Sequence, residues 1–402
     1  MQTNPMMDAY LLDWLNLLLR FAHVITGIAW IGASFYFVFL DLSLKAPADP
    51  VLKDKGVDGE LWAVHGGGFY NPQKYLVAPK SLPEHLHWFI WESYSTWLTG
   101  FALFTVLYLF NASTFLVDTN VFHWSAGAAI VAALGFLAAG WIVYDAICRI
   151  FGQRARGDLI VGVLLFVYVV AATWLACQLF AGRAAFLLVG AMLATAMSAN
   201  VLFWIIPGQR KVIAQMRAGQ PVDPVHGQRA KQRSLHNTYF TLPVLVSMVS
   251  NHYGWLYQSR HNWLVLVALM LAAALVRHSF VARHKALVLR QPVPWGYAVV
   301  GVVVMLGVAG ALMPAPPSAA AAARPATLAD VHAIVEQRCL MCHNAQVQQK
   351  NVALHTDALI RQHAQAMYQQ TVVLKLMPLS NATQITDDER AVIKRWFEGG
   401  AK

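Results

Sequence analysis

Charged residues are scarce in this chain, because only 12% of its 402 residues are Asp, Glu, Lys or Arg. A soluble globular protein carries roughly 25% of these residues, so the deficit points to a membrane protein. The chain has only four cysteines, which excludes a disulfide framework. Hydrophobic residues make up 57% of it. Its net charge of +10 does not indicate nucleic-acid binding, because the basic residues lie in loops between apolar segments.

Eight segments are long and apolar enough to span a bilayer as helices, which takes about 20 residues each. The sixth is diluted by polar residues such as Asn251 and His252, so we expect this helix to face the protein interior. The pattern predicts an all-α fold, with a polytopic membrane helix bundle over residues 1–313. The predicted spans lie near residues 10–40, 86–110, 121–145, 159–180, 184–206, 236–256, 262–282 and 295–313.

Lys and Arg residues are distributed unevenly between the loops that join these spans. The loops on one side of the membrane contain seventeen, whereas the loops on the other side contain only Arg183 and Arg260. Cytoplasmic loops of membrane proteins are enriched in Lys and Arg. We therefore expect the N-terminus and residue 314 to face away from the cytoplasm.

A change in composition separates the bundle from the end of the chain. Residues 314–326 (PAPPSAAAAARPA) have the composition of a semi-extended Pro/Ala spacer. Beyond it, residues 327–402 have the hydrophobicity of a small soluble domain, whose core would be marginal without a covalent staple. The capping-box residues Thr386 to Glu389 predict a final helix that ends at Gly399.

The motif Cys339-Leu-Met-Cys342-His343 is a C-x-x-C-H sequence, which is the attachment signature of c-type haem. Two thioethers would form at the cysteines, with His343 as the proximal iron ligand. A zinc site would need a second ligand pair and a redox dithiol would need a βαβ pattern, and neither is evident. Met377, followed by proline, is the expected sixth ligand, and thioether ligation raises the reduction potential. Alternative sixth ligands are Met367, His355 and His363.

This motif predicts one haem c in a small class I-type cytochrome c domain. Because c-type haem is attached outside the cytoplasm, the motif agrees with the topology that the Lys and Arg distribution predicts.

Histidines inside the spans raise the question of a second haem. His23 lies near mid-membrane with Arg20 three residues before it, hence on the same side of the helix. This pair fits a b-type haem with Arg20 on a propionate, or else a hydrogen-bonded packing histidine. His236 and His252 are further ligand candidates, but a separation of 16 residues places them about 160° apart around an ideal helix. They are therefore poor candidates for one shared haem column.

Glu92 is the expected buried acid near the cytoplasmic third of its span. It would relay protons or bind substrate, or simply pair with Arg277 or a histidine.

Several short motifs in the predicted bundle are distinctive. They are Arg20-Phe-Ala-His23, Trp91-Glu-Ser-Tyr94, His236-Asn-Thr-Tyr-Phe-Thr-Leu-Pro243, Ser250-Asn-His-Tyr253 and Arg277-His278. Through these motifs and the cytochrome that follows, the chain resembles the membrane-bound, cytochrome c-fused urate oxidases of bacteria over essentially its whole length. This resemblance implies oxidation of urate to 5-hydroxyisourate in the bacterial inner membrane, with the cytochrome domain in the periplasm. Electrons would pass through the cytochrome to a respiratory acceptor such as a soluble cytochrome or a terminal oxidase.

Electron counting adds a physical constraint to that expectation. Urate gives up two electrons, whereas one haem c accepts one, and the two lie on opposite sides of a hydrocarbon layer about 30 Å thick. We therefore expect a redox group inside the bundle, which favours the b-type haem.

Urate is anionic near neutral pH, so its pocket should offer positive charge and hydrogen-bonding groups. A carboxylate or a histidine there could accept a proton. The substrate-binding candidates are Arg277, Asn237 and Thr238, and the catalytic candidates are Glu92, His236 and His278.

Two other classes of function remain open at this stage. A quinol–cytochrome c electron-transfer module would use the same haems without urate chemistry. A transporter or sensor fused to a cytochrome is disfavoured, because no internal repeat is visible. Membrane lipid is an expected partner in every case, and a homo-oligomer is one option.

Overall fold

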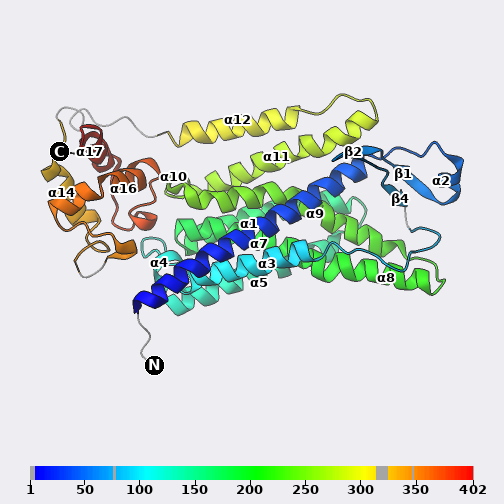
Figure 1. Ribbon diagram of the computed structural model, residues 1–402, viewed down its shortest axis with the longest axis horizontal. Helices are drawn as coiled ribbons and strands as arrows, with labels where there is room; N and C mark the ends of the chain where they lie inside the picture. Colours follow the sequence, from blue (N-terminus) through cyan, green and yellow to red (C-terminus); the bar gives the residue numbers. More distant parts are fainter. Residues whose placement is uncertain (1–4, 76–77, 314–324, 346–347, 402) are drawn as a thin grey trace.

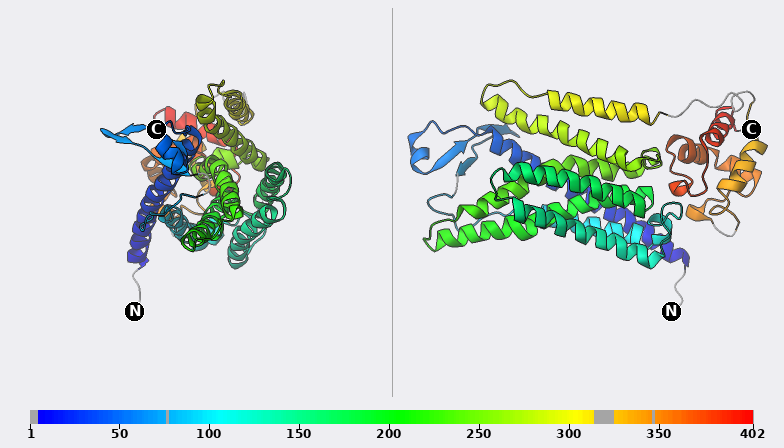
Figure 2. Two further views of the ribbon diagram at one scale, coloured as in Figure 1. Left: turned by 90° about the vertical axis from the view of Figure 1, so that its right-hand side faces the viewer. Right: turned by 180° about the vertical axis from the view of Figure 1, so that it is seen from behind.

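In the computed structural model, long helices lie side by side and form an elongated bundle (Figure 1). The structure describes residues 5–75, 78–313, 325–345 and 348–401. A separate helical unit at residues 325–401 lies at one end of the bundle, and four short strands lie at the other (Figures 1 and 2). We call these ends the C-terminal-unit end and the hairpin end. Residues 314–324 of the predicted spacer lie outside the described residues.

Each of the eight predicted spans contains a helix of the bundle. By length and composition, five described helical stretches could cross a membrane, so the chain is a helical membrane protein, and the number of eight spans stays a prediction. The five stretches are Tyr10–Ser43, Ala126–Phe151, Gly157–Leu179, Gly182–Arg217 and Asn262–Val288. The bundle helices are α1 (Pro5–Ser43), α3 (Trp91–Phe104), α5 (Ala126–Phe151), α6 (Gly157–Leu179), α7 (Gly182–Asn200), α9 (Pro224–Val249), α11 (Asn262–Val288) and α12 (Gly296–Ala311).

The predicted bounds of the sixth span are wrong at both ends. Helix α9 begins at Pro224, because Asp223 accepts a hydrogen bond from the Val225 backbone N–H and proline fits the first helical turn. It ends at Val249 and is followed by a short 3-10 turn that contains His252. Hydropathy located the apolar part of this helix but not its polar beginning.

Shorter elements extend or connect the bundle helices. The 41–84 loop folds into two small antiparallel pairs, β1 with β4 and β2 with β3, so the expected all-α fold holds for the bundle but not for this loop. The short elements are α2 (Pro50–Asp54), β1 (Val57–Glu60), β2 (Ala63–His65), β3 (Gly68–Tyr70), β4 (Gln73–Tyr75), η1 (Thr105–Leu109), α4 (Ala112–Phe115), η2 (Val201–Ile205), α8 (Ile206–Arg217), η3 (Ser250–His252) and α10 (Gly254–Tyr257).

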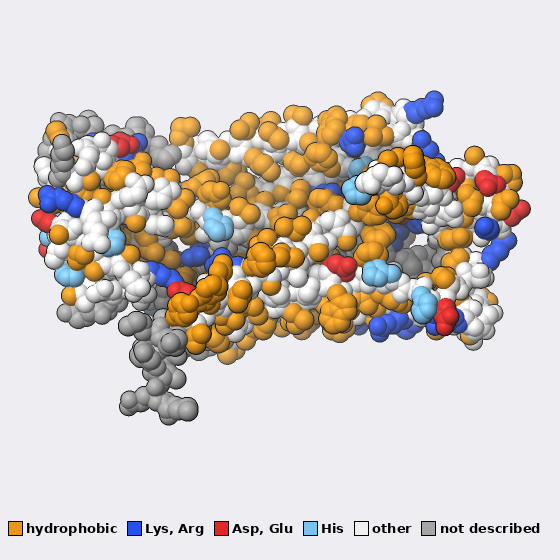
Figure 3. Space-filling view, in the orientation of Figure 1, with side chains coloured by type: hydrophobic (Ala, Val, Ile, Leu, Met, Phe, Trp, Pro, Cys, Tyr) orange, Lys and Arg blue, Asp and Glu red, His pale blue; other side chains and the backbone are white. Residues whose placement is uncertain are grey.

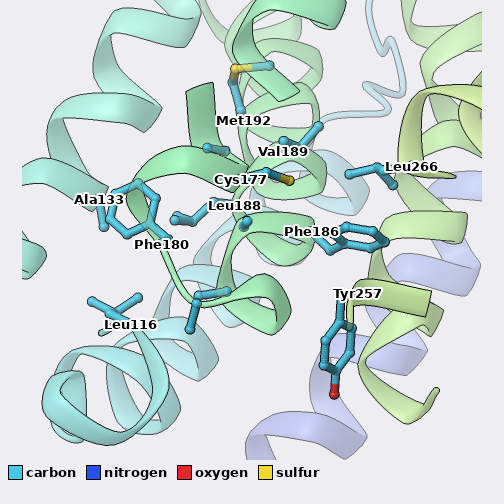
Figure 4. Close-up of a cluster of buried hydrophobic side chains, with 14 of the residues drawn as sticks. Leu116, Ala133, Cys177, Phe180, Phe186, Leu188, Val189, Met192, Tyr257 and Leu266 are labelled. Carbon is cyan, nitrogen blue, oxygen red and sulfur yellow. The ribbon is translucent and has the colours of Figure 1, made fainter. Parts of the chain in front are cut away.

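Helix α7 is the most enclosed of the long helices, and its buried side chains form the middle of the bundle core (Figure 4). Small residues let neighbouring helices approach it closely: a Cβ added to Gly190 would lie 2.6 Å from the Cβ of Ser247 on α9. Close packing of this kind holds membrane helices together where lipid offers no hydrophobic drive. On the surface, apolar side chains cover the body of the bundle in Figure 3, while Lys and Arg gather towards its ends.

Residues 325–401 pack around a core of their own. The capping box predicted at Thr386 is confirmed, and helix α17 ends before Gly399 as expected. Val331, Val335, Ile360, Ile393 and Trp396 are among its buried side chains. Its elements are α14 (Leu328–Arg338), η4 (Gln349–Asn351), α15 (Asp357–Gln362), α16 (Ala364–Tyr368), η5 (Gln369–Val373), η6 (Leu379–Asn381) and α17 (Asp387–Glu398).

Candidate functional site

A buried carboxylate on α5 is the centre of an ion-pair network in the hairpin half of the bundle. Asp145 Oδ1 accepts hydrogen bonds of 2.7 Å from both Arg233 Nη2 and Trp204 Nε1. Its other oxygen lies 2.5 Å from Arg149 Nε. Only 3% of the Arg233 side chain is exposed, so this charge is paired almost completely out of contact with solvent. A buried pair of this kind is costly to break, because the remaining charge has no compensation.

His236 and Asn237 lie in a hydrogen-bonded layer directly beside this network. His236 Nδ1 lies 2.9 Å from the Tyr144 hydroxyl, which also accepts a hydrogen bond of 2.8 Å from Asn200 Nδ2. Asn200 Nδ2 also lies 2.9 Å from Asn237 Oδ1, and Asn237 Nδ2 donates to the Met197 carbonyl at 3.0 Å. We call Tyr144, Asp145, Asn200, Arg233, His236 and Asn237 the polar layer. His236 Nδ1 and both amide atoms of Asn237 thus already have protein partners.

The neighbouring candidates on α9 and α11 face elsewhere. The Thr238 hydroxyl donates to the Ser234 carbonyl of its own helix at 3.0 Å. His278 Nδ1 lies 2.7 Å from the Tyr239 hydroxyl, and its ring meets Tyr297 of α12 edge-on at 4.5 Å between centroids. His278 therefore belongs to a separate group between α9, α11 and α12.

Arg277 and Glu92 differ from the other candidates, because buried polar atoms on both lack partners. Arg277 is 5% exposed, and its Cζ lies 3.7 Å from the ring centroid of Phe35 on α1. Its Nε and Nη2 have no hydrogen-bond partner among the described residues, and the same holds for Glu92 Oε2. The alternative in which Glu92 simply pairs with Arg277 is not seen in the described parts of the chain. A buried guanidinium with unused donors calls for an anion.

His23 packs on the face of α3. Its Nδ1 lies 3.1 Å from the Thr96 carbonyl and 3.2 Å from the Thr99 hydroxyl. A Cβ added to Gly100 would lie 2.8 Å from His23 Cε1, so the glycine makes room for the ring. A carbonyl partner on one ring nitrogen is the usual way in which a protein orients a metal-binding histidine, and it suits a packing histidine equally well.

Arg20 lies on α1 in the other half of the bundle, where its Nε donates to Asn16 Oδ1 at 2.8 Å. Tyr108 and Arg183 both donate to Asn251 Oδ1, at 2.7 and 3.1 Å. His252 follows Asn251 and is exposed beyond the end of α9. The end of α9 at Val249 therefore separates it from His236, and the angle predicted for one continuous helix does not apply.

The C-x-x-C-H motif lies at the end of α14. His343 Nδ1 lies 3.0 Å from the Val352 carbonyl, which leaves Nε2 as the ring nitrogen for a ligand. Cys342 is exposed and Cys339 is buried. The pKa of the Cys339 thiol is raised to about 11. Burial of the thiol is the main cause, and the neighbouring Cys342 acts in the same direction. The donor set of two free thiols and an oriented imidazole fits a covalently attached haem.

Met377 lies in a loop that a buried arginine holds in place. Arg390 donates from Nη1 to the Met377 carbonyl at 3.1 Å and also to the Thr371 carbonyl. The alternative ligand Met367 is buried in the hydrophobic core of the unit. Within the described residues, no group of three or more His, Cys, Asp or Glu could hold a bare metal ion.

A cavity of about 500 Å³ lies at the hairpin end, beside α8. Two arginines and an indole give it a positive and aromatic lining, and Arg210 Cζ lies 5.8 Å from the Trp88 ring centroid. The lining residues are Glu84, His85, Leu86, Trp88, Arg210, Ile213, Ala214 and Arg217.

Comparison with known proteins decides the family. A family model described as "Urate oxidase N-terminal" matches residues 9–311, which contain almost the whole bundle. The chain belongs to this family. Comparisons with curated proteins and with solved structures gave no match. Membership of the urate oxidase N-terminal family indicates a urate-related function and an oxidoreductase, which confirms the predicted family, while the cytochrome fusion stays a prediction.

The substrate-binding and catalytic residues that the sequence predicted do not form one cluster in the structure. His236 and Asn237 belong to the polar layer, His278 belongs to a second group, and Arg277 and Glu92 each have buried polar atoms without a partner among the described residues. Thr238 belongs to none of these groups.

Sequence reasoning missed the polar residues that surround His236 in this family member. Asp145 was a detectable signal, because an acid beside an apolar span is rare and costly. By sequence, Arg233 belongs to the basic loop before the sixth predicted span, whose Lys and Arg residues contribute to the predicted membrane orientation. The start of α9 at Pro224 instead carries it into the bundle.

Proposed function

We propose that the chain oxidises urate to 5-hydroxyisourate inside the bundle and passes the electrons to a c-type haem in residues 325–401. Urate and water give 5-hydroxyisourate, two protons and two electrons. The observation that carries this proposal is the buried Arg277, whose Nε and Nη2 are aimed at no partner among the described residues. Urate, a planar anion, would accept hydrogen bonds from both of these donors.

The substrate site in this proposal lies between α1, α3 and α11. The fork of Arg277 binds the urate anion through two parallel hydrogen bonds, which adds geometric specificity to the charge attraction. The ring of Phe35 supports the guanidinium from one side. Glu92 Oε2 accepts a proton, because it is a buried carboxylate oxygen without a donor.

His236 and Asn237 take a different role from the one that the sequence predicted. Their hydrogen bonds to Tyr144 and Asn200 leave them as positioning residues that fix α9 against α5 and α7. The cavity at the hairpin end serves as the approach for an anion, because Arg210 and Arg217 raise the local concentration of negatively charged substrate.

Two haem sites complete the proposed electron path. Cys339 and Cys342 would hold haem c covalently, and His343 and Met377 would be its iron ligands. In the bundle, His23 would ligate a haem b, and Arg20 together with Arg183 would face its carboxylates; His252 is a second candidate ligand. These haems supply one-electron transfer, which divides the two-electron oxidation into single steps.

The test is anaerobic addition of urate to oxidised membranes that contain the full chain. The reduced haem c band should appear with urate and should grow with urate concentration. Reduction by a quinol but not by urate would contradict the proposal and would favour the quinol–cytochrome c module. A pyridine haemochrome spectrum of the same sample tests the bundle haem, and a spectrum with c-type haem only would exclude the His23 site.

A further inference from the structure

The loop that carries Met377 contacts the end of the bundle through backbone atoms. The Gly254 N–H on α10 donates to the Leu374 carbonyl at 3.1 Å. Gln258, directly after the last residue of α10, donates through Nε2 to the Lys375 carbonyl. Leu376, directly before Met377, packs against the hydrophobic core of the bundle. Three consecutive residues of the C-terminal unit thus meet the bundle immediately beside the expected iron ligand.

Gly254 is required for this contact on steric grounds. A Cβ at this position would lie 2.1 Å from the Lys375 carbonyl oxygen and 2.6 Å from its carbonyl carbon. Both are backbone atoms, so no side-chain rotation can relieve the clash. Gly127, at the start of α5, is a useful contrast, because a Cβ there would meet nothing within 4 Å.

Polar side chains join the two parts away from this backbone contact. Lys350 Nζ lies 2.9 Å from Asp13 Oδ1 of α1, and Gln384 Nε2 lies 3.3 Å from Asn120 Oδ1. The exposed fractions of Lys350 and Asp13 are 78% and 66%, so this ion pair adds little stability. The arrangement has an apolar and backbone centre with a polar rim, as specific interfaces do.

We propose that the C-terminal unit works as a fixed relay, docked on α10 through residues 374–376, and not as a shuttle that swings between partners. The Met377 loop beside α10 would then be the side on which the unit takes up electrons from the bundle, for the haem that the proposed function assigns to it. The attachment residues would form the side that releases them, because Cys342 is exposed and Met341 is 65% exposed. Docking therefore leaves the exit free for an external acceptor. The electron path in this inference rests on the proposed function, whereas the docking of the unit on α10 does not.

Zero-length carbodiimide cross-linking of the full haem-loaded chain tests the docking without any activity assay. The wild type should give a cross-linked peptide between Asp13 and Lys350. The ion pair between Lys394 and Glu398, at 3.8 Å within α17, provides an internal control that does not depend on docking. Absence of the Asp13–Lys350 product while the Lys394–Glu398 product forms would overturn the proposal.

Substitutions sharpen this test. Gly254→Ala should lower the Asp13–Lys350 yield about tenfold, as a loss of about 1.4 kcal/mol would, and leave the Lys394–Glu398 yield unchanged. Gly127→Ala should change neither yield. Gln258→Ala, which removes one hydrogen bond without a clash, should give a smaller decrease and serves if Gly254→Ala does not fold. Equal Asp13–Lys350 yields in all variants would contradict docking on α10.

Electron transfer through the cross-linked chain then separates a relay from a shuttle. A relay keeps both the urate-driven reduction of haem c and its reoxidation by an external cytochrome at wild-type rates. A shuttle keeps the reduction and loses the reoxidation, which would refute the relay. If urate fails to reduce haem c even before cross-linking, the proposed function fails, while the cross-linked peptide still decides the docking.

Discussion

Replacement of Arg277 by methionine distinguishes a substrate-binding arginine from a structural one. Arg277→Met keeps the length of the side chain and removes the charge and all its donors. Loss of a bidentate, charge-assisted contact to urate should cost about 3 kcal/mol, or about 100-fold in kcat/KM. Because Nε and Nη2 have no partner among the described residues, removal of this buried charge should outweigh the loss of the Phe35 contact, and the folded protein should gain about 1 kcal/mol or more. The assay is urate-dependent haem c reduction together with thermal unfolding in detergent.

Arg233→Met is the matched control, because Arg233 is equally buried but paired with Asp145 at 2.7 Å. Breaking that pair leaves the buried Asp145 carboxylate with the largely exposed Arg149 as its remaining charge partner, and it should destabilise the chain by about 3 kcal/mol. The two substitutions should therefore shift the melting temperature in opposite directions, with Arg277→Met raising it and Arg233→Met lowering it. A lower melting temperature for Arg277→Met with unchanged kcat/KM would show that Arg277 is structural and would refute the substrate site.

Three further results are expected. Gly100→Ala places a methyl group against the His23 ring, so the b-type signal in the pyridine haemochrome spectrum should fall at least about tenfold, while haem c should stay. Met377→Ala should lower the haem c reduction potential in a redox titration, with the covalent haem retained. Burial disfavours the ionised form of Glu389, but hydrogen bonds from the Thr386 backbone and from Arg338 prevail and lower its pKa. The stability it adds is thus present above the ordinary carboxyl pKa and lost as pH falls. The wild type should therefore melt at a higher temperature than Glu389→Gln near neutral pH, and this difference should vanish in acid.

The helical bundle could be predicted from hydropathy, because each apolar run long enough for a bilayer does form a helix. The bounds of α9 could not, since its first turns are polar and are set by the Asp223 cap and Pro224. The small strands of the 41–84 loop were also missed, because each has only three or four residues and no long alternating pattern.

The candidate site was predictable in its residue types but not in its grouping. Successive residues of a helix point about 100° apart, so neighbours in the motif around His236 face different helices. His236 faces Tyr144 of α5, Asn237 faces α7, and Tyr239 meets His278 of α11. Which of these directions leads to substrate depends on the packing of all the helices, and a single sequence does not contain that information in readable form.

The buried stretch of α7 between Ala184 and Asn200 has a consequence for the membrane potential. These residues span about 24 Å, and the buried side chains packed around them are mostly apolar up to Asn200, where the polar layer begins. In the proposed reaction, electrons would cross this stretch between the haems, whereas protons released beside Glu92 would find few hydrogen-bonding side chains among the described residues around it. With the orientation that the Lys and Arg distribution predicts, each electron would move outward and the protons would stay inside. Urate oxidation would then discharge the membrane, and a potential of 100 mV would drive each complete electron crossing by about 2.3 kcal/mol.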